Sequence, residues 1–115
     1  MTEKRFDHEV ENICNTIKEV LSIKAKEYRR NNNPLHNFDV GVAMSNGTSS
    51  REEIIYGMAL KHIISIQDIR NDVKNGKLPS TDLLNEKYGD AINYLILEKA
   101  SIIDKIEQNH QILPF

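Results

Sequence analysis

An apolar residue recurs every three or four positions through most of this chain, and that spacing constrains the fold more than any other feature. Positions three and four apart lie on the same face of an α-helix, so each stretch with this spacing predicts an amphipathic helix. The spacing is interrupted near Pro34 and Gly76, residue types that end helices for steric and conformational reasons. We therefore predict long helices over about 3–30, 50–75 and 80–108.

The predicted fold class is all-α, with residues 1–115 forming one domain. The linker over 31–50 is expected to contain a short helix or a packed turn around 37–44, and an apolar tail covers 109–115. Apolar residues between Ala91 and Leu97 occupy more than one face of the third helix. Three helices cannot cover all of them, so we expect an oligomeric helical bundle: a homo-oligomer that is a dimer or larger.

The net charge, the cysteine count and the lengths of apolar runs indicate which partners and which cellular compartment to expect. The 15 Lys and Arg residues against 17 Asp and Glu give a formal charge of -2, which argues against a nucleic-acid binder. The lone Cys14 excludes a disulfide framework and favours a reducing compartment. No apolar run approaches the roughly 18 residues of a membrane span, and no signal peptide is recognisable. We expect a cytoplasmic protein that binds neither nucleic acid nor membrane.

A polar stripe interrupts the apolar surface of the third predicted helix. Glu86, Asp90 and Asn93 fall on one face, with Tyr94 beside them. We interpret the stripe as one wall of a nucleotide site, in which Asn93 hydrogen-bonds a base or sugar and Tyr94 stacks. Glu86 and Asp90 also form a carboxylate pair that suits Mg²⁺, a cofactor expected only if the protein is a Mg²⁺ enzyme. The alternative is that both carboxylates are solvated positions at the start of the helix.

Two other regions offer contacts for such a ligand. Lys61 lies among apolar residues of the second predicted helix, so we expect a buried ammonium that meets a phosphate or pairs with a carboxylate of the third helix. The alternative is that its side chain snorkels to water. Its neighbour His62 is expected to be a core or interface histidine. Basic residues crowd the end of the first predicted helix. They either complement the helix dipole or form an anion-binding corner beside Asn37 and Phe38, which would then belong to a stacking wall.

Several short segments together resemble a known family. Lys24-Ala25-Lys26-Glu27-Tyr28 ends the first helix, Asn37-Phe38 precedes the second, Leu60-Lys61 lies within it, and Glu86 to Tyr94 follows an acid-x-x-x-Asp-x-x-Asn-Tyr pattern. These segments are similar to the phage nucleotide-modification-associated domain, a diverged relative of the all-α NTP pyrophosphatase (MazG-like) fold. The resemblance spans roughly residues 10–106. It implies an all-α fold and a nucleotide-like small molecule as ligand.

The same resemblance implies that part of the pyrophosphatase metal site is missing. Leu60 stands where those enzymes have an acid, and Ile64 where an arginine is expected. With its carboxylates reduced to Glu86 and Asp90, the site would hold Mg²⁺ poorly. We therefore expect a protein that binds a nucleotide or nucleotide-derived signalling molecule and sequesters it rather than hydrolysing it. A Mg²⁺-dependent nucleotide pyrophosphohydrolase and a non-enzymatic helical interaction protein are the alternatives.

The residues expected to contact the ligand come from all three long helices and the linker. They are Lys24, Tyr28, Asn37, Phe38, Lys61, Glu86, Asp90, Asn93 and Tyr94. The sequence contains no Walker motif, Gly-rich phosphate loop or zinc-ligand spacing, so enzyme classes that depend on those motifs are disfavoured. No catalytic residue is assigned.

Overall fold

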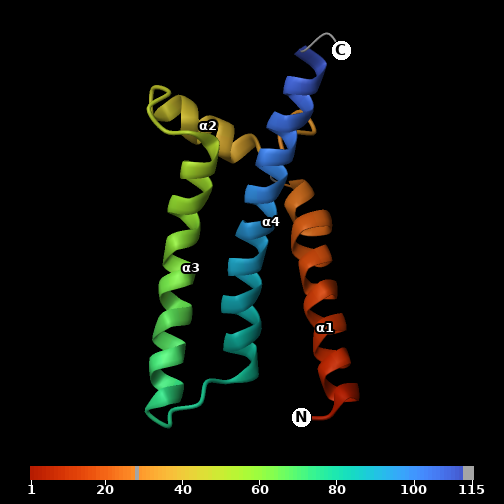
Figure 1. The fold of residues 1–115 in the computed structure, drawn as a ribbon, viewed down its shortest axis with the longest axis vertical. Helices are drawn as coiled ribbons and strands as arrows, with labels where there is room; N and C mark the ends of the chain where they lie inside the picture. Colours follow the sequence, from red (N-terminus) through yellow and green to blue (C-terminus); the bar gives the residue numbers. More distant parts are fainter. Residues whose placement is uncertain (28, 113–115) are drawn as a thin grey trace.

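The computed structural model describes residues 1–27 and 29–112, except for the side chains of residues 24, 27 and 110–112. The described chain is all-helical (Figure 1), as the apolar spacing predicts, and contains no β-strand. Its α-helices are α1 (Glu3–Lys18), α2 (His36–Met44), α3 (Arg51–Lys74) and α4 (Thr81–Ile112). The prediction of three long helices and a short one in the linker is therefore confirmed.

The hairpin of α3 and α4 organises the rest of the fold (Figure 1). These two helices run antiparallel and make the most extensive contact in the molecule. α1 packs alongside α4, and α2 lies across the start of α3, at the end of the bundle opposite the hairpin turn. The resulting shape is elongated, with extents of 55 × 31 × 30 Å. Within the described residues, no helix is both long and apolar enough to cross a membrane.

Local capping explains where the hairpin helices begin and end. Ser50 accepts a hydrogen bond from the Glu53 N–H at 3.1 Å, and the Glu53 carboxylate accepts one from the Ser50 N–H at 2.9 Å. This reciprocal capping box begins α3. Gly76, at φ +82°, ends it in the left-handed conformation that glycine adopts without steric cost. Ser80 then caps α4 by accepting from the Leu83 N–H at 3.1 Å. α4 continues to Ile112, beyond the predicted end near 108.

The first predicted helix, over 3–30, is regular only as far as Lys18. A π-helical turn (Glu19–Ile23) widens it, and a 3-10 turn (Lys24–Glu27) follows. A π turn shifts carbonyls out of the regular α-helical hydrogen-bond pattern. The Leu21 carbonyl instead accepts from Nη2 of Arg29 at 2.8 Å, which folds the chain back on itself. No Pro or Gly marks this change in the sequence, so the apolar spacing alone predicts an unbroken helix.

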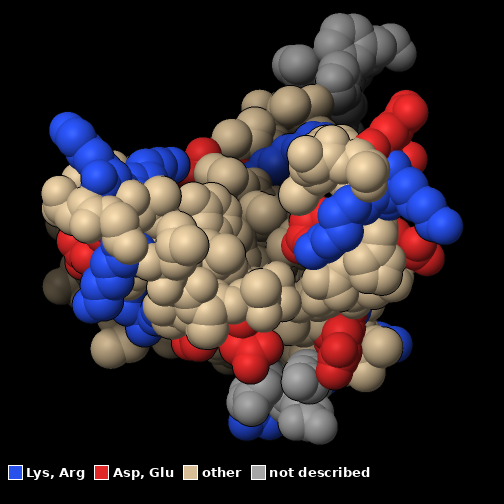
Figure 2. Space-filling view, turned by 90° about the horizontal axis from the view of Figure 1, so that it is seen from below, with Lys and Arg blue, Asp and Glu red and all other residues tan. Residues whose placement is uncertain are grey.

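The buried core is small and lies between α2, α3 and α4. Leu35, Phe38 and Ile55 form its centre, and Tyr94 and Leu97 of α4 pack against them. The remaining buried apolar residues continue along one face of α3; they are Ala59, Ile66 and Ile69. Figure 2 looks along the bundle from the hairpin-turn end. In this view, uncharged surface covers much of the middle of the molecule, and charged side chains lie at the left and lower edges and in a group right of centre.

More surface is exposed than a compact protein of this mass would leave. The accessible surface is 8842 Å² for 13.2 kDa, whereas a compact monomer of that mass exposes about 6,400 Å². The radius of gyration is 17.3 Å, against about 13 Å for a compact chain of this length. The exposed large apolar residues include Tyr56, Leu60, Ile63 and Ile64 of α3 and Leu95, Ile102, Ile103 and Ile106 of α4.

Candidate ligand-binding cleft

An open cleft lies where the end of the first helical segment meets α2, α3 and α4. Its volume is about 520 Å³, within the range of roughly 300–1,000 Å³ that is usual for small-molecule sites. We call it the main cleft. It is lined by Val20, Leu21, His36, Asn37, Phe38, Val40, Met58, His62, Asp90, Asn93, Tyr94 and Leu97.

A stacked aromatic pair and a carboxylate form one part of its wall. His62 of α3 and Tyr94 of α4 stack with ring centroids 5.3 Å apart and an interplanar angle of 26°. His62 Nδ1 lies 3.5 Å from Asp90 Oδ2, a distance longer than a normal hydrogen bond. The side chain of Asp90 is 38% exposed, so its carboxylate keeps contact with solvent, whereas that of His62 is only 12% exposed. Flat rings beside an acceptor suit a heterocycle that carries N–H donors.

Asn93 contributes an acceptor that the described residues do not satisfy. The residue is only 6% exposed, and its Oδ1 is closed off from solvent with no hydrogen-bond partner among the described residues. Leaving a buried polar atom unpaired costs about 1–3 kcal/mol. Asn93 lines the main cleft one helical turn from Asp90, and the terminal torsion of an Asn side chain is soft. A donor placed in the cleft could therefore be met by rotation of this amide.

The structure brings most of the predicted stripe together with the linker residues. Asp90, Asn93 and Tyr94 of α4 line the main cleft along with Asn37 and Phe38 of α2. Phe38 is a core residue at 7% exposure, whereas Asn37 is exposed. These five residues come from two segments more than 50 positions apart in the chain, joined by the contacts of α2 with α3 and of α3 with α4.

Other predicted residues lie elsewhere. Lys61 is exposed and does not line the main cleft, so the expectation of a buried ammonium is wrong. The inward-facing positions of α3 include Ile55, Ala59 and Ile66, and this series continues through 62 rather than 61. Glu86, with a side chain 63% exposed, lies 3.8 Å from Lys87 and also stays outside the cleft. The remaining predicted contacts, the Lys24 side chain and Tyr28, lie outside the described residues.

The donor set does not fit a resident Mg²⁺. Asp90 is the single carboxylate among the described residues that line the main cleft. Glu86 and Asp90 face different partners, Lys87 and His62. Over the described part of the chain, no group of three or more His, Cys, Asp or Glu side chains is placed to hold a metal ion. A Mg²⁺ site normally gathers carboxylate oxygens around one point, and this arrangement does not.

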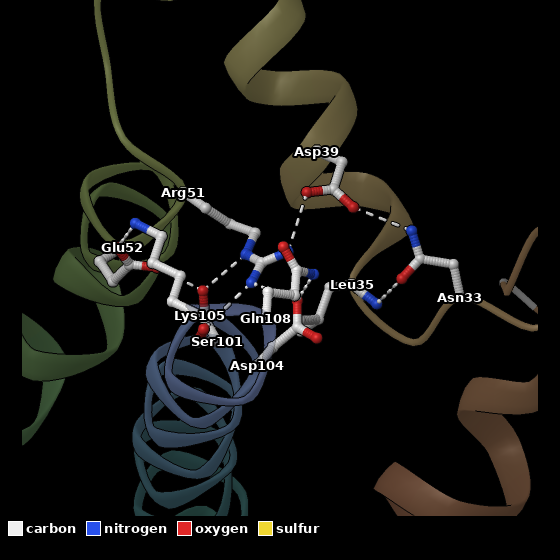
Figure 3. Close-up of polar contacts among 9 residues, drawn as sticks. All are labelled: Asn33, Leu35, Asp39, Arg51, Glu52, Ser101, Asp104, Lys105 and Gln108. Atoms are coloured by element: carbon white, nitrogen blue, oxygen red, sulfur yellow. Dashed lines mark hydrogen bonds and ion pairs between the residues drawn. The ribbon is translucent and has the colours of Figure 1, made fainter. Parts of the chain in front are cut away.

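A polar network that no sequence pattern predicts joins α2, α3 and α4 beside the cleft (Figure 3). Arg51 Nη1 lies 3.2 Å from Asp39 Oδ1, and its Nη2 lies 2.9 Å from Asp104 Oδ2. Its Nε donates to the Ser101 hydroxyl oxygen at 2.6 Å and its Nη2 to the Ser101 carbonyl at 3.0 Å. Ser101, itself fully buried, donates to the Glu52 carboxylate. We call these residues, together with Lys105, the Arg51 network.

At Arg51 and Glu52, hydrogen bonds and nearby charges shift the pKa more than burial does. Burial opposes the charged guanidinium, but the hydrogen bonds and charges of Asp104 and Asp39 raise the pKa of Arg51 above its ordinary value. Burial likewise opposes the Glu52 carboxylate, but hydrogen bonds from Lys105 and Ser101 lower the pKa of Glu52 below its ordinary value. Both groups are therefore charged at neutral pH, and Asp39 ties α2, one wall of the main cleft, to the hairpin.

Neither His62 nor Arg51 is predicted from the sequence to have a role in the site, although a sequence signal exists for each. The series 55, 59, 62, 66, 69 places His62 on the inward seam of α3, and that spacing is the signal that identifies it. For Arg51 the signal is a cation in the first turn of a helix, where the dipole disfavours positive charge unless a partner compensates. Comparison with family models, curated proteins and solved structures finds no match to the chain.

Proposed function

We propose that the main cleft binds a nucleotide or a nucleotide-derived signalling molecule. The observation that carries the proposal is the buried amide of Asn93, whose Oδ1 has no donor within the described residues. A base edge that presents N–H groups satisfies this oxygen and the neighbouring Asp90 carboxylate together. The His62–Tyr94 stack supplies the adjoining flat surface. The resemblance to the phage nucleotide-modification-associated domain points to the same class of ligand.

We further propose that the ligand is sequestered rather than hydrolysed. Hydrolysis of a phosphoanhydride requires a bound metal or a positioned base to activate water. The main cleft offers one carboxylate among its described lining residues, and of its two histidines, His36 and His62, the latter is largely buried and stacked on Tyr94. Leu60 and Ile64, where the pyrophosphatases carry an acid and an arginine, agree with this reading. The protein would lower the free concentration of its ligand without changing it chemically.

The decisive experiment replaces Asn93 by leucine, which has nearly the same shape but no polar atom. Removing the unpaired acceptor should stabilise the free protein by about 1–3 kcal/mol. It should also abolish the stabilisation by nucleotide, which reaches about 2.7 kcal/mol at 100 times the dissociation constant. Thermal melting with a panel of nucleotides measures both effects. Asn71→Leu, the same replacement at an exposed position of α3, is the matched control and should leave nucleotide binding intact.

Two outcomes separate the rival functions. Nucleotide recovered unchanged after denaturing the complex supports sequestration, whereas conversion of an added nucleoside triphosphate to its monophosphate would favour a nucleotide pyrophosphohydrolase. If no nucleotide raises the melting temperature of the wild-type protein, nucleotide binding is refuted and the helical interaction protein becomes the better reading.

We also propose that the protein functions as a homo-oligomer, a dimer or larger. The surface in excess of a compact monomer, roughly 2,400 Å², is larger than the approximately 800 Å² per partner that a standard interface buries. Leu95, Ile102 and Ile106 recur on α4 with spacings of seven and four and are all exposed. The same face of a second copy would cover them symmetrically. Light scattering after gel filtration should report more than one chain per particle, and a monomer at micromolar concentration would contradict this.

A further inference from the structure

A second cleft adjoins the main one and carries the opposite charge. This side cleft, of about 380 Å³, shares Leu21, His36, Asn37, Phe38 and Leu97 with the main cleft. The two clefts therefore share a wall around the start of α2, and we call them together the trough. With histidines counted as neutral, Asp90 is the one charged residue among the described residues that line the main cleft. Arg29 is the one charged residue among those that line the side cleft.

Among the described residues, the guanidinium of Arg29 is only partly used. Its Nη2 donates to the Leu21 carbonyl at 2.8 Å, which fixes the side chain against the π turn. Its Nε is closed off from solvent and has no hydrogen-bond partner among the described residues. A guanidinium has five N–H donors in a planar fork that matches phosphate oxygens. No carboxylate is found among the described residues that line the side cleft, so nothing there competes with an anionic ligand.

We propose that the trough binds a nucleoside monophosphate in one orientation, with the base in the main cleft and the phosphate against Arg29 in the side cleft. This inference rests on the proposed function and adds the position and number of the phosphates. The Asp90 carboxylate repels a phosphate from the main cleft and accepts from base N–H groups. One guanidinium in the side cleft suits a single phosphate, because a triphosphate would leave most of its charge uncompensated.

The test compares each of the four 5′-nucleoside monophosphates with its own nucleoside, by titration calorimetry on the full chain. For the base that binds, the monophosphate should bind the wild-type protein about tenfold tighter than the nucleoside, or more, which corresponds to one charge-assisted contact. Arg29→Gln should reduce this ratio to near one, and because the ratio compares two ligands of the same variant, any change in nucleoside affinity cancels. Arg29→Lys should keep part of the preference, because it retains the charge without the planar fork.

Arg30→Gln is the matched control, since Arg30 is exposed and lines neither cleft. It should keep the full preference for the phosphate. If nucleosides bind the wild-type protein as tightly as monophosphates, or if Arg29→Gln keeps the preference, the phosphate assignment is overturned while the proposed function stands. If no nucleoside or nucleotide binds, both are overturned. Unfolding of Arg29→Gln, visible as lost helical circular dichroism, would transfer the decision to Arg29→Lys and to the wild-type ratio.

Discussion

Replacing Arg51 by methionine should destabilise the protein far more than removing an ordinary surface arginine. Methionine keeps an unbranched apolar side chain but removes every donor of the guanidinium. The change removes the donor to the hydroxyl and carbonyl oxygens of the fully buried Ser101, and the cation shared by Asp39 of α2 and Asp104 of α4. The Arg51 side chain is 13% exposed, so water cannot readily replace the lost contacts.

The size of the effect follows from the individual contacts. A hydrogen bond from a charged group to a buried hydroxyl contributes about 1.5–3 kcal/mol. The ion pairs contribute less, because the side chains of Asp39 and Asp104 are 44% and 39% exposed, and such pairs contribute about 0.2–1 kcal/mol each. The expected loss is roughly 3 kcal/mol. For a chain of this size that lowers the melting temperature by about 12 °C.

Urea unfolding followed by helical circular dichroism measures this loss, with all variants at one protein concentration because self-association shifts apparent stability. Arg5→Met is the matched control. Arg5 also pairs with a carboxylate at 2.9 Å, that of Glu9, but these side chains are 51% and 44% exposed. Its loss should be about 0.3–0.5 kcal/mol. If the Arg51→Met loss is no larger than that of Arg5→Met, the argument that burial strengthens this network is wrong.

Three further predictions concern pH, packing and base preference. Because hydrogen bonds hold the pKa of Glu52 below its ordinary value of 4.5, the stability from this group is complete above pH 4.5 and is lost as the pH falls through the folded-state pKa. Glu52→Gln should remove part of this acid sensitivity in thermal melts; an unchanged profile would contradict it. A Cβ at Gly41 would lie 2.8 Å from Cγ2 of Ile54, so Gly41→Ala should destabilise by about 1–3 kcal/mol. Gly57→Ala, with no atom within 4 Å of the new Cβ, should stabilise by about 0.5–1 kcal/mol; equal effects in urea unfolding would refute the packing argument. Guanine nucleotides should bind more tightly than uracil nucleotides in calorimetry, because the Asp90 carboxylate and Asn93 Oδ1 both accept hydrogen bonds and guanine presents more N–H donors. The reverse order would refute this.

The helices could be predicted because their signals are local. Apolar spacing and the caps at Ser50, Gly76 and Ser80 depend on residues within a few positions of each other. The sequence also predicts that the polar stripe of α4 lies near Asn37 and Phe38, provided that the stripe faces the inside of the bundle. The π turn after Lys18 does not follow, because its Leu21 carbonyl is satisfied by Arg29, eight positions later in an irregular segment.

Lys61 shows why neighbours in sequence are a poor guide to burial. Its neighbours Leu60, Ile63 and Ile64 are apolar, and this suggests an enclosed ammonium. All three are exposed in the described chain, so the apolar setting is a surface rather than a core. The face of α3 that meets α4 is defined by the 55, 59, 62, 66, 69 series, and His62 belongs to it. Burial therefore follows from a residue's spacing relative to the face that packs on α4, and not from whether its sequence neighbours are apolar.

The two buried polar residues of α4 differ in whether their side-chain atoms have hydrogen-bond partners. Asn93 and Ser101 both occupy buried positions of α4, two turns apart, where apolar residues would also fit the helix pattern. Ser101 is fully satisfied by Arg51 and Glu52, so it stabilises the junction that positions α2. Asn93 Oδ1 has no hydrogen-bond partner among the described residues, and an unpaired buried acceptor costs stability in a chain whose core is already small. This unpaired oxygen in the wall of a cleft, beside a fully paired serine on the same helix, is the observation on which the proposal of a ligand rests.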